Sequence, residues 1–302
     1  MKVGLFALAS PYTENPAVLA RKAEEVGFDS FWLPEHPVLP VNYKTRYPLA
    51  EDGKIPQPYG HMADPLIGLA CAAAVTKRIK LATGVCLVPE REALLLAKQV
   101  ATLDHYSGGR VILGVGGGWL REETELFGVQ FSRRWLKLKE TVLAMRELWT
   151  KEEAEFHGKL VDFPPVRCIP KPAQKPGPPV VLGAHGEPGM KRVVAWADGW
   201  CPLGTAPDDF RRDLTRLREL ARAAGRDPAR IEVTVLQGVT EASPFADLIR
   251  GYQDAGADRV VLTLGGAEGP GAFGAPYLYK PGEGGGAAKV EWLAERSVAR
   301  LR

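Results

Sequence analysis

Two side chains that can move protons stand side by side where an apolar run of the sequence ends. Glu35 and His36 close the run Ser30–His36, and an imidazole next to a carboxylate can donate or accept a proton near neutral pH. A structural role fits the pair equally well, with Glu35 capping backbone and His36 packed. The pair becomes an acid–base site only if the fold opens toward a ligand at this point.

Glycines mark two further places where a ligand can reach the backbone. Gly84 lies inside an apolar run, which indicates a bulge, a ligand or, more simply, close packing. Gly116, Gly117 and Gly118 follow the run Val111–Val115, where missing side chains would admit a flat ligand. Their spacing is not a dinucleotide fingerprint, which requires the first unit of an open sheet.

A third glycine-bordered segment has the composition of a phosphate-binding turn. Gly183, Ala184, His185 and Gly186 end an apolar run, and Pro188 suits the first turn of a following helix. Backbone amides at the start of a helix favour phosphate, although a plain strand-to-helix turn fits the segment as well.

Other classes of site are not supported by residue spacing. His61, His105 and His157 show no metal-binding spacing, so we predict no metal. The four cysteines form no C-x-x-C pair, which suits a reducing compartment, and Cys71 and Cys86 lie in apolar runs as expected packed thiols. The balance of 39 basic and 36 acidic residues argues against a nucleic-acid partner.

The sequence contains no membrane or export signal. One lysine precedes the apolar run Val3–Leu8, which is not the layout of a signal peptide. No apolar stretch approaches the roughly 18–20 residues of a membrane span. We therefore predict a cytoplasmic protein without a membrane partner.

The elements that must position these residues alternate regularly along the 302 residues. Eight near-continuously apolar runs predict buried parallel strands: Val3–Leu8, Ser30–His36, Ile79–Val88, Val111–Val115, Pro178–Gly183, Gly199–Leu203, Ile231–Gln237 and Arg259–Leu264. Helices are expected between and after them: Pro16–Gly27, Asp64–Val75, Arg91–Tyr106, Ser132–Trp149, Pro188–Ala197, Asp208–Ala224, Pro244–Ala255 and Ala288–Arg300. A hairpin-like segment covers Phe156–Ile169.

Eight such units predict a single (β/α)8 TIM barrel over residues 1–302. An open doubly wound sheet is the alternative, and eight regular units with no second domain favour closure. Two long segments that follow strands, Pro37–Ala63 and Gly265–Gly286, are expected as insertion loops at the carboxyl face, where barrel enzymes carry their sites.

Many segments, taken in order along the chain, resemble one known superfamily. They are Tyr47–Pro56, Asp64–Leu66, Leu81–Val85, Leu95–Gln99, Ala101–Asp104, Ser107–Arg110, Gly114–Glu123, Leu148–Thr150, Phe156–Gly158, Pro170–Pro172 and Ala197–Trp200. Together they resemble the luciferase-like monooxygenases, especially the branch of deazaflavin (coenzyme F420)-dependent oxidoreductases. The likeness covers nearly the whole chain and weakens after about residue 240.

The resemblance implies a bacterial-luciferase-like barrel with an isoalloxazine-like ring on its carboxyl face. It implies a non-proline cis peptide at Gly84–Val85 beneath the ring, next to Thr83, and contacts from Glu35 and His36 to the ring. The remaining cofactor contacts implied are the strand-end glycines Gly116, Gly117 and Gly118 and the phosphate turn Gly183, Ala184, His185 and Gly186.

The activity implied is hydride transfer between coenzyme F420 and a small organic substrate. His36 would donate or accept a proton, Glu35 would orient it, and Tyr59, His61 and Trp119 would form the substrate wall. The alternatives are an FMN-dependent monooxygenase that uses O2 and a partner flavin reductase, and a non-catalytic flavin-binding barrel. The resemblance also implies a homodimer, with the helix Asp64–Val75 as a plausible contact.

Overall fold

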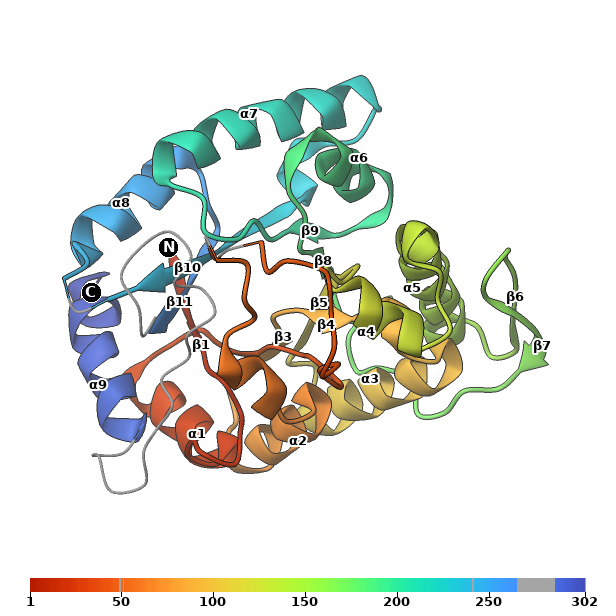
Figure 1. The fold of residues 1–302 in the computed structure, drawn as a ribbon, viewed down its shortest axis with the longest axis horizontal. Coiled ribbons are helices and arrows are strands. Elements are labelled where there is room, and N and C mark those ends of the chain that lie inside the picture. The colour runs from red at the N-terminus through yellow and green to blue at the C-terminus, as the bar shows by residue number, and fades with distance from the viewer. Residues whose placement is uncertain (49, 51, 241, 265–285, 302) are drawn as a thin grey trace.

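The computed structural model describes residues 1–48, 50, 52–240, 242–264 and 286–301, and a ring of parallel strands forms its centre (Figure 1). The strands are β1 (Lys2–Phe6), β2 (Ser30–Leu33), β3 (Lys80–Thr83), β4 (Cys86–Leu87), β5 (Val111–Gly116), β8 (Val180–Leu182), β9 (Gly199–Trp200), β10 (Glu232–Val239) and β11 (Arg259–Leu264).

The pairing of these strands closes the sheet. Each neighbour in the order β1, β2, β3, β5, β8, β9, β10, β11 is parallel, and β11 pairs again with β1. β3 and β4 both pair with β5, so they are two parts of one barrel strand, interrupted at Gly84 and Val85. The peptide bond between these two residues is cis, as the family resemblance implies. The predicted (β/α)8 barrel is confirmed.

Helices surround the ring in Figure 1, and their bounds follow the predicted rhythm. They are α1 (Pro16–Val26), α2 (Pro65–Val75), α3 (Ala93–Ser107), α4 (Arg121–Leu126), α5 (Arg134–Thr150), α6 (Gly186–Trp196), α7 (Pro207–Ala223), α8 (Phe245–Ala255) and α9 (Gly286–Arg296). Short 3-10 turns are η1 (Gln57–His61), η2 (Val88–Glu90), η3 (Phe131–Arg133), η4 (Pro228–Arg230) and η6 (Val298–Leu301). The hairpin-like segment is the antiparallel pair β6 (Ala154–His157) and β7 (Asp162–Val166).

Two layers of apolar side chains hold the barrel together. The inside of the ring is filled by Trp32, Ala82, Ile112, Val181, Cys201, Leu236 and Val261. A larger buried cluster lies between the strands and the helices, which explains why the strands are apolar on both faces. One side of α5 belongs to it, because Leu138, Val142, Met145 and Trp149 are buried.

Two local predictions differ from the structure. The helix expected from Ser132 begins at Arg134, because Ser132 and Arg133 lie within η3. Cys71 is exposed rather than packed. α2 is apolar on all sides, so its sequence pattern could not show which face turns outward. The short helix α4 was not predicted.

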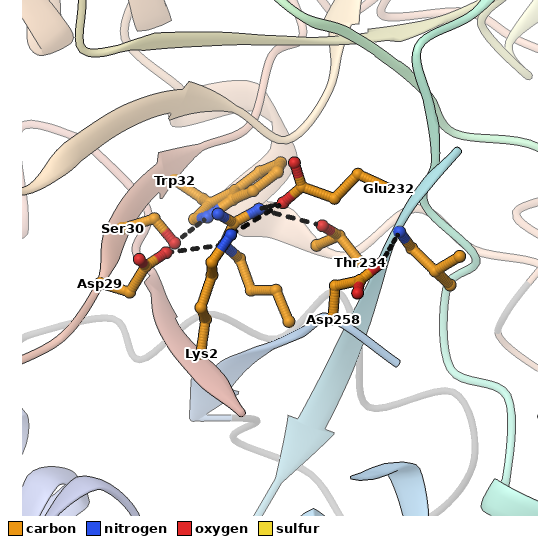
Figure 2. A network of polar contacts seen from close by, with 9 residues as sticks. Lys2, Asp29, Ser30, Trp32, Glu232, Thr234 and Asp258 are labelled. Carbon is orange, nitrogen blue, oxygen red and sulfur yellow. Dashed lines mark hydrogen bonds and ion pairs between the residues drawn. The ribbon is translucent and has the colours of Figure 1, made fainter. Parts of the chain in front are cut away.

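A polar network fixes the amino end of the barrel, opposite the site described below (Figure 2). Arg259 is buried and donates hydrogen bonds to Asp29 Oδ2 at 2.7 Å, to Glu232 Oε1 at 2.5 Å and to Thr234 Oγ1 at 3.2 Å. Asp258 accepts from the Val233 amide at 2.8 Å. The strand starts of β10 and β11 are thereby joined to the segment that enters β2.

One of the two long insertions can be described. Within Pro37–Ala63 the turn η1 returns the chain toward the barrel. The other predicted insertion, Gly265–Gly286, lies outside the described residues except for Gly286, the first residue of α9. No helix in the described ranges is long and apolar enough to cross a membrane.

Candidate active site at the carboxyl ends of the strands

A cavity of about 350 Å³ lies at the carboxyl ends of the barrel strands. It brings together residues from four places predicted from the sequence: Gly84 and Val85, Gly116 to Trp119, Gly183 to His185, and Tyr59. Tyr47, Leu87, Trp135, Cys201, Leu203 and Leu236 complete much of its wall. The lining is mainly apolar and includes several glycines, which leaves room for a flat ligand against the backbone.

A second, smaller cavity of about 130 Å³ adjoins the first and contains Glu35 and His36. The two cavities share Tyr59, Gly84, Val85 and Trp119 in their walls, so they form one site. We call this combined space the strand-end cavity. The acid–base pair and the glycine segments, distant in sequence, therefore face the same space.

Two glycines of β5 are required because the neighbouring strand lies too close for a side chain. A Cβ atom on Gly114 would lie 2.0 Å from the Thr83 carbonyl oxygen. Thr83 is buried, lines neither part of the strand-end cavity, and donates its hydroxyl to the Gly114 carbonyl at 2.6 Å. A Cβ on Gly116 would lie 2.6 Å from the Val85 side chain. These glycines let β5 approach the interrupted strand closely.

His36 is held by a carboxylate that sequence reasoning missed. Its Nδ1 lies 2.7 Å from Glu123 Oε2, and both side chains are buried. A carboxylate on Nδ1 keeps the proton there and leaves Nε2 as the acceptor in the neutral ring. The His36 ring lies 5.1 Å from the Tyr59 ring and 5.7 Å from the Trp119 ring, centroid to centroid.

Glu35 does not orient His36, which corrects the prediction. Its Oε2 accepts from the Leu87 amide at 2.6 Å, and its Oε1 accepts from Arg91 Nε at 2.8 Å. Arg91 also donates to Asp64 Oδ2 at 2.7 Å. Burial opposes the charge on Arg91, but Glu35 outweighs it and raises the pKa of the guanidinium. Glu35 thus ties the end of β2 to β4 and to the start of α3.

A third carboxyl, Glu90, lies behind the glycine segment. Thr124 Oγ1 donates to Glu90 Oε1 at 3.0 Å, and a Cβ on Gly118 would lie 3.1 Å from that oxygen. Burial, reinforced by the charge of Glu123, raises the pKa of Glu90 to about 8. The other oxygen of Glu90 and Oε1 of Glu123 are buried without a hydrogen-bond partner in the described part of the chain.

Aromatic residues from the insertion 37–63 form one wall of the strand-end cavity. The Tyr47 and Tyr59 hydroxyls lie 2.8 Å apart, and the Tyr47 ring contacts the Trp119 ring edge-on at 5.3 Å. Burial raises the pKa of both tyrosines, so both stay protonated. His61 lines neither part of the cavity and lies edge-on to Tyr12 at 4.8 Å.

The predicted phosphate turn runs from the cavity wall into α6. Ala184 and His185 line the cavity, and Gly186, with φ of +65°, begins the helix. Burial lowers the pKa of His185. Glu187 turns away, because it pairs with Lys191 at 2.7 Å and Arg216 at 2.9 Å. The amides at the start of α6 are therefore not screened by this carboxylate.

Metal chemistry finds no support in the described ranges. No group of three or more histidine, cysteine, aspartate or glutamate side chains there could hold a metal ion.

Known proteins resemble this chain in sequence and in fold. The family model for luciferase-like monooxygenases matches residues 1–266. An uncharacterised protein of Mycobacterium tuberculosis is 43% identical over 231 residues, which cover 75% of this chain and 80% of the relative. An F420-dependent glucose-6-phosphate dehydrogenase of Amycolatopsis mediterranei is 29% identical over 242 residues, covering 78% of this chain and 68% of that enzyme.

Solved structures share the fold at low sequence identity. The monooxygenase RslO1 of Streptomyces bottropensis superposes with a TM-score of 0.74 at 20% identity. The coenzyme F420-dependent tetrahydromethanopterin reductase of Methanopyrus kandleri superposes with a TM-score of 0.71 at 18% identity. Each comparison covers 100% of both chains. With the family model matched over most of its length, this chain belongs to the luciferase-like monooxygenase family.

Proposed function

We propose that the protein is a coenzyme F420-dependent oxidoreductase that transfers a hydride to or from a small organic substrate. The observation that carries the proposal is the His36–Glu123 pair in the wall of an apolar, glycine-lined cavity. The likeness to F420-dependent glucose-6-phosphate dehydrogenases supports the choice of a deazaflavin.

The residues present fit a flat ring with a phosphorylated tail. Gly84, Val85 and Gly116 to Gly118 would hold the ring, because they present backbone and little side chain to the cavity. The turn from Gly183 to Gly186 would hold the phosphate, since it leads into the amino end of α6. When bound, a deazaflavin supplies a ring carbon that gives or takes a hydride, a two-electron step.

The role of His36 follows from its hydrogen bond. Nδ1 is engaged by Glu123, so Nε2 is the nitrogen that can take up or deliver the proton that accompanies the hydride. The Glu123 carboxylate stabilises the imidazolium that forms when Nε2 takes up a proton. Trp119 and Tyr59 exclude water on either side of the imidazole, and they would also contact the substrate.

An FMN-dependent monooxygenase is the second candidate, because the fold also superposes, with a TM-score of 0.62, on the FMN-bound oxygenating constituent of 3,6-diketocamphane monooxygenase of Pseudomonas putida. That function would require O2 and a partner flavin reductase to supply reduced FMN. We also propose a homodimer with either cofactor, and the exposed Ile67 on α2 is a suitable contact residue.

The deciding experiment titrates the purified protein with coenzyme F420 and with FMN, in both redox states, and follows absorbance and fluorescence. Tight binding of F420 with weak binding of FMN supports hydride transfer and directs the substrate search to carbonyls, imines and activated alkenes. The reverse preference supports the monooxygenase. Binding of neither cofactor would overturn both functions.

A matched variant connects binding to chemistry. In His36→Ala, we expect turnover to fall while the dissociation constant of the cofactor stays close to that of the wild type. Unchanged turnover would remove His36 from the mechanism.

A further inference from the structure

A buried group of charged residues lies behind the wall of the strand-end cavity, and one member has no partner for its charge. His36 pairs with Glu123, and Glu35 pairs with Arg91. Glu90 is 5% exposed, yet among the described residues it receives only the hydroxyl of Thr124. An ionised carboxylate in such a position is costly unless a cation balances it.

The charged groups around Glu90 do not provide that cation. On its own segment, the charge of Arg91 acts to lower the Glu90 pKa, but burial and Glu123 outweigh it, and Arg91 donates its hydrogen bonds to Glu35 and Asp64 instead. Glu92 caps the Leu95 amide. From α4, Glu123 faces it with a like charge, and from the end of β2 Glu35 does the same. Arg133 and Lys137 line the next cavity, but no ion pair joins either of them to Glu90 within the described ranges.

The position of Glu90 links two spaces. Its Oε1 lies against the backbone of Gly118, which lines the strand-end cavity. Glu90 also lines a separate cavity of about 450 Å³, between η2 and the segment 127–137. Exposed residues such as Phe127 and Arg133 border this second cavity, so it brings solvent up to the Glu90 segment without passing through the active site.

We propose that Glu90 is a positioning residue that keeps its proton at neutral pH, so that Glu123 carries the single negative charge facing His36. It exchanges this proton with solvent through the cavity beside α5. Its effect on turnover rests on the proposed function, whereas its protonation does not.

Ionisation of Glu90 would place a second negative charge beside Glu123. The His36–Glu123 pair would then hold its proton more tightly, and proton transfer at Nε2 would change with it. The raised pKa of Glu90, about 8, sets the pH at which this change begins.

The first test is infrared spectroscopy of the whole protein without cofactor, at pH values on both sides of this pKa. We expect the C=O band of a protonated, buried carboxylic acid at neutral pH in the wild type, and its loss above about pH 8. Glu90→Gln should lack the band throughout. Glu125→Gln, an exposed substitution on the same helix as Glu123, should retain it. A band that persists in Glu90→Gln, or is absent from the wild type at neutral pH, overturns the proposal.

A second test measures thermal stability as a function of pH. The raised pKa of Glu90 fixes the direction of the expected change. The pKa of Glu90 rises from 4.5 to about 8 on folding. The stability that the protonated carboxyl contributes to the folded state is therefore fully present below pH 4.5 and is lost as the pH rises to about 8. Glu90→Gln should therefore gain thermal stability relative to the wild type across this window. Glu125→Gln should show no such trend. A pH-independent difference for Glu90→Gln counts against the proposal.

Turnover provides the third readout once a substrate is known. Wild-type turnover should decline through a single ionisation near the Glu90 pKa and level off above it, and Glu90→Gln should lack this decline. If neither F420 nor FMN supports turnover, the proposed function fails, while the infrared and stability results still decide the role of Glu90.

An unchanged decline in Glu90→Gln, with turnover present, contradicts the role of Glu90 alone. If Glu90→Gln does not fold, the infrared change of the wild type with pH still tests the protonation.

Discussion

At the scale of single residues, the chemistry depends on which ring nitrogen of His36 faces the substrate. Glu123 lies 87 residues further along the chain, and its carboxylate fixes that choice through Nδ1. An amide in its place could still form a hydrogen bond but would not stabilise an imidazolium.

We therefore expect Glu123→Gln to lower turnover by about a hundredfold, within the range of general acid–base contributions. The dissociation constant of the cofactor should change little, because Glu123 lines neither part of the strand-end cavity. Steady-state kinetics beside a binding titration would measure both, with Glu125→Gln as the control. Turnover within twofold of the wild type would contradict the assignment.

The sequence predicted the position of His36 but not its partner, for a geometric reason. Adjacent residues of an extended segment point to opposite sides, so Glu35 and His36 face different neighbours. Glu35 reaches Arg91, and His36 reaches a helix that periodicity did not reveal. A signal was present, since Glu123 ends the family-like segment Gly114–Glu123, but spacing alone could not bring it to His36.

At the scale of elements, the six-residue helix α4 contacts both His36 and the insertion 37–63. Glu123 faces His36, and the preceding Glu122 accepts from the backbone amides of Lys44 at 2.7 Å and Thr45 at 3.2 Å. The helix thus holds the insertion that supplies Tyr47 and Tyr59 to the cavity wall. It escaped prediction because six residues are too few to show a helical period.

Loss of the hydrogen bonds between Glu122 and the amides of Lys44 and Thr45 should make the insertion less rigidly held. Burial opposes the charge of Glu122, but the Lys44 and Thr45 amides outweigh it and lower its pKa to about 2. The stability that these hydrogen bonds contribute is therefore present above the ordinary pKa of 4.5 and is lost as pH falls toward 2.

For Glu122→Gln we expect a rise in KM of a few fold with a smaller change in kcat, and a loss of stability at neutral pH that disappears in acid. Thermal unfolding from neutral to acid pH would measure the second effect against the wild type. A stability difference that stayed constant down to pH 2 would show that the charge of Glu122 has no part in it.

The close approach of β3 and β5 gives another prediction at this scale. In Gly114→Ala the added methyl would lie 2.0 Å from the Thr83 carbonyl, and neither backbone can move without opening the ring. We expect destabilisation at or above the roughly 1–3 kcal/mol typical of overpacking, measured by denaturant unfolding. Gly60→Ala is the control, because its Cβ would meet Leu39 at an ordinary 3.5 Å. Similar stability of the two variants would refute the packing argument.

The elements themselves were largely predictable, because strands buried on both faces are apolar throughout and their alternation with helices is regular. Ile79–Val88 was predicted as one strand, whereas β3 and β4 are separated at Gly84 and Val85. A glycine in a strand signals such an interruption only as one of several possibilities.

At the scale of the whole molecule, the amino end of the barrel carries the charge network and the carboxyl end carries the site. The buried Arg259 guanidinium forms ion pairs with Asp29 and Glu232, whose carboxylates are partly exposed. None of these three residues lines the strand-end cavity.

Replacement of Arg259 by Met should therefore cost stability without altering the site. We expect a loss of about 2–3 kcal/mol, less than for a fully buried pair because solvent screens the two carboxylates. Chemical denaturation would measure the loss, and cofactor titration of the folded variant should give the wild-type dissociation constant. A weakened cofactor affinity would show that the two ends are coupled.

The separation of these two ends bears on how such a protein changes over generations. The insertion 37–63 supplies Tyr47 and Tyr59 to the cavity wall, and mutations in it do not alter the polar network of Arg259. Substitutions that change the substrate can then accumulate without removing the stability that the ion pairs of Arg259 provide. A laboratory selection for altered specificity should accordingly draw its diversity from this insertion and keep Asp29, Glu232 and Arg259 constant.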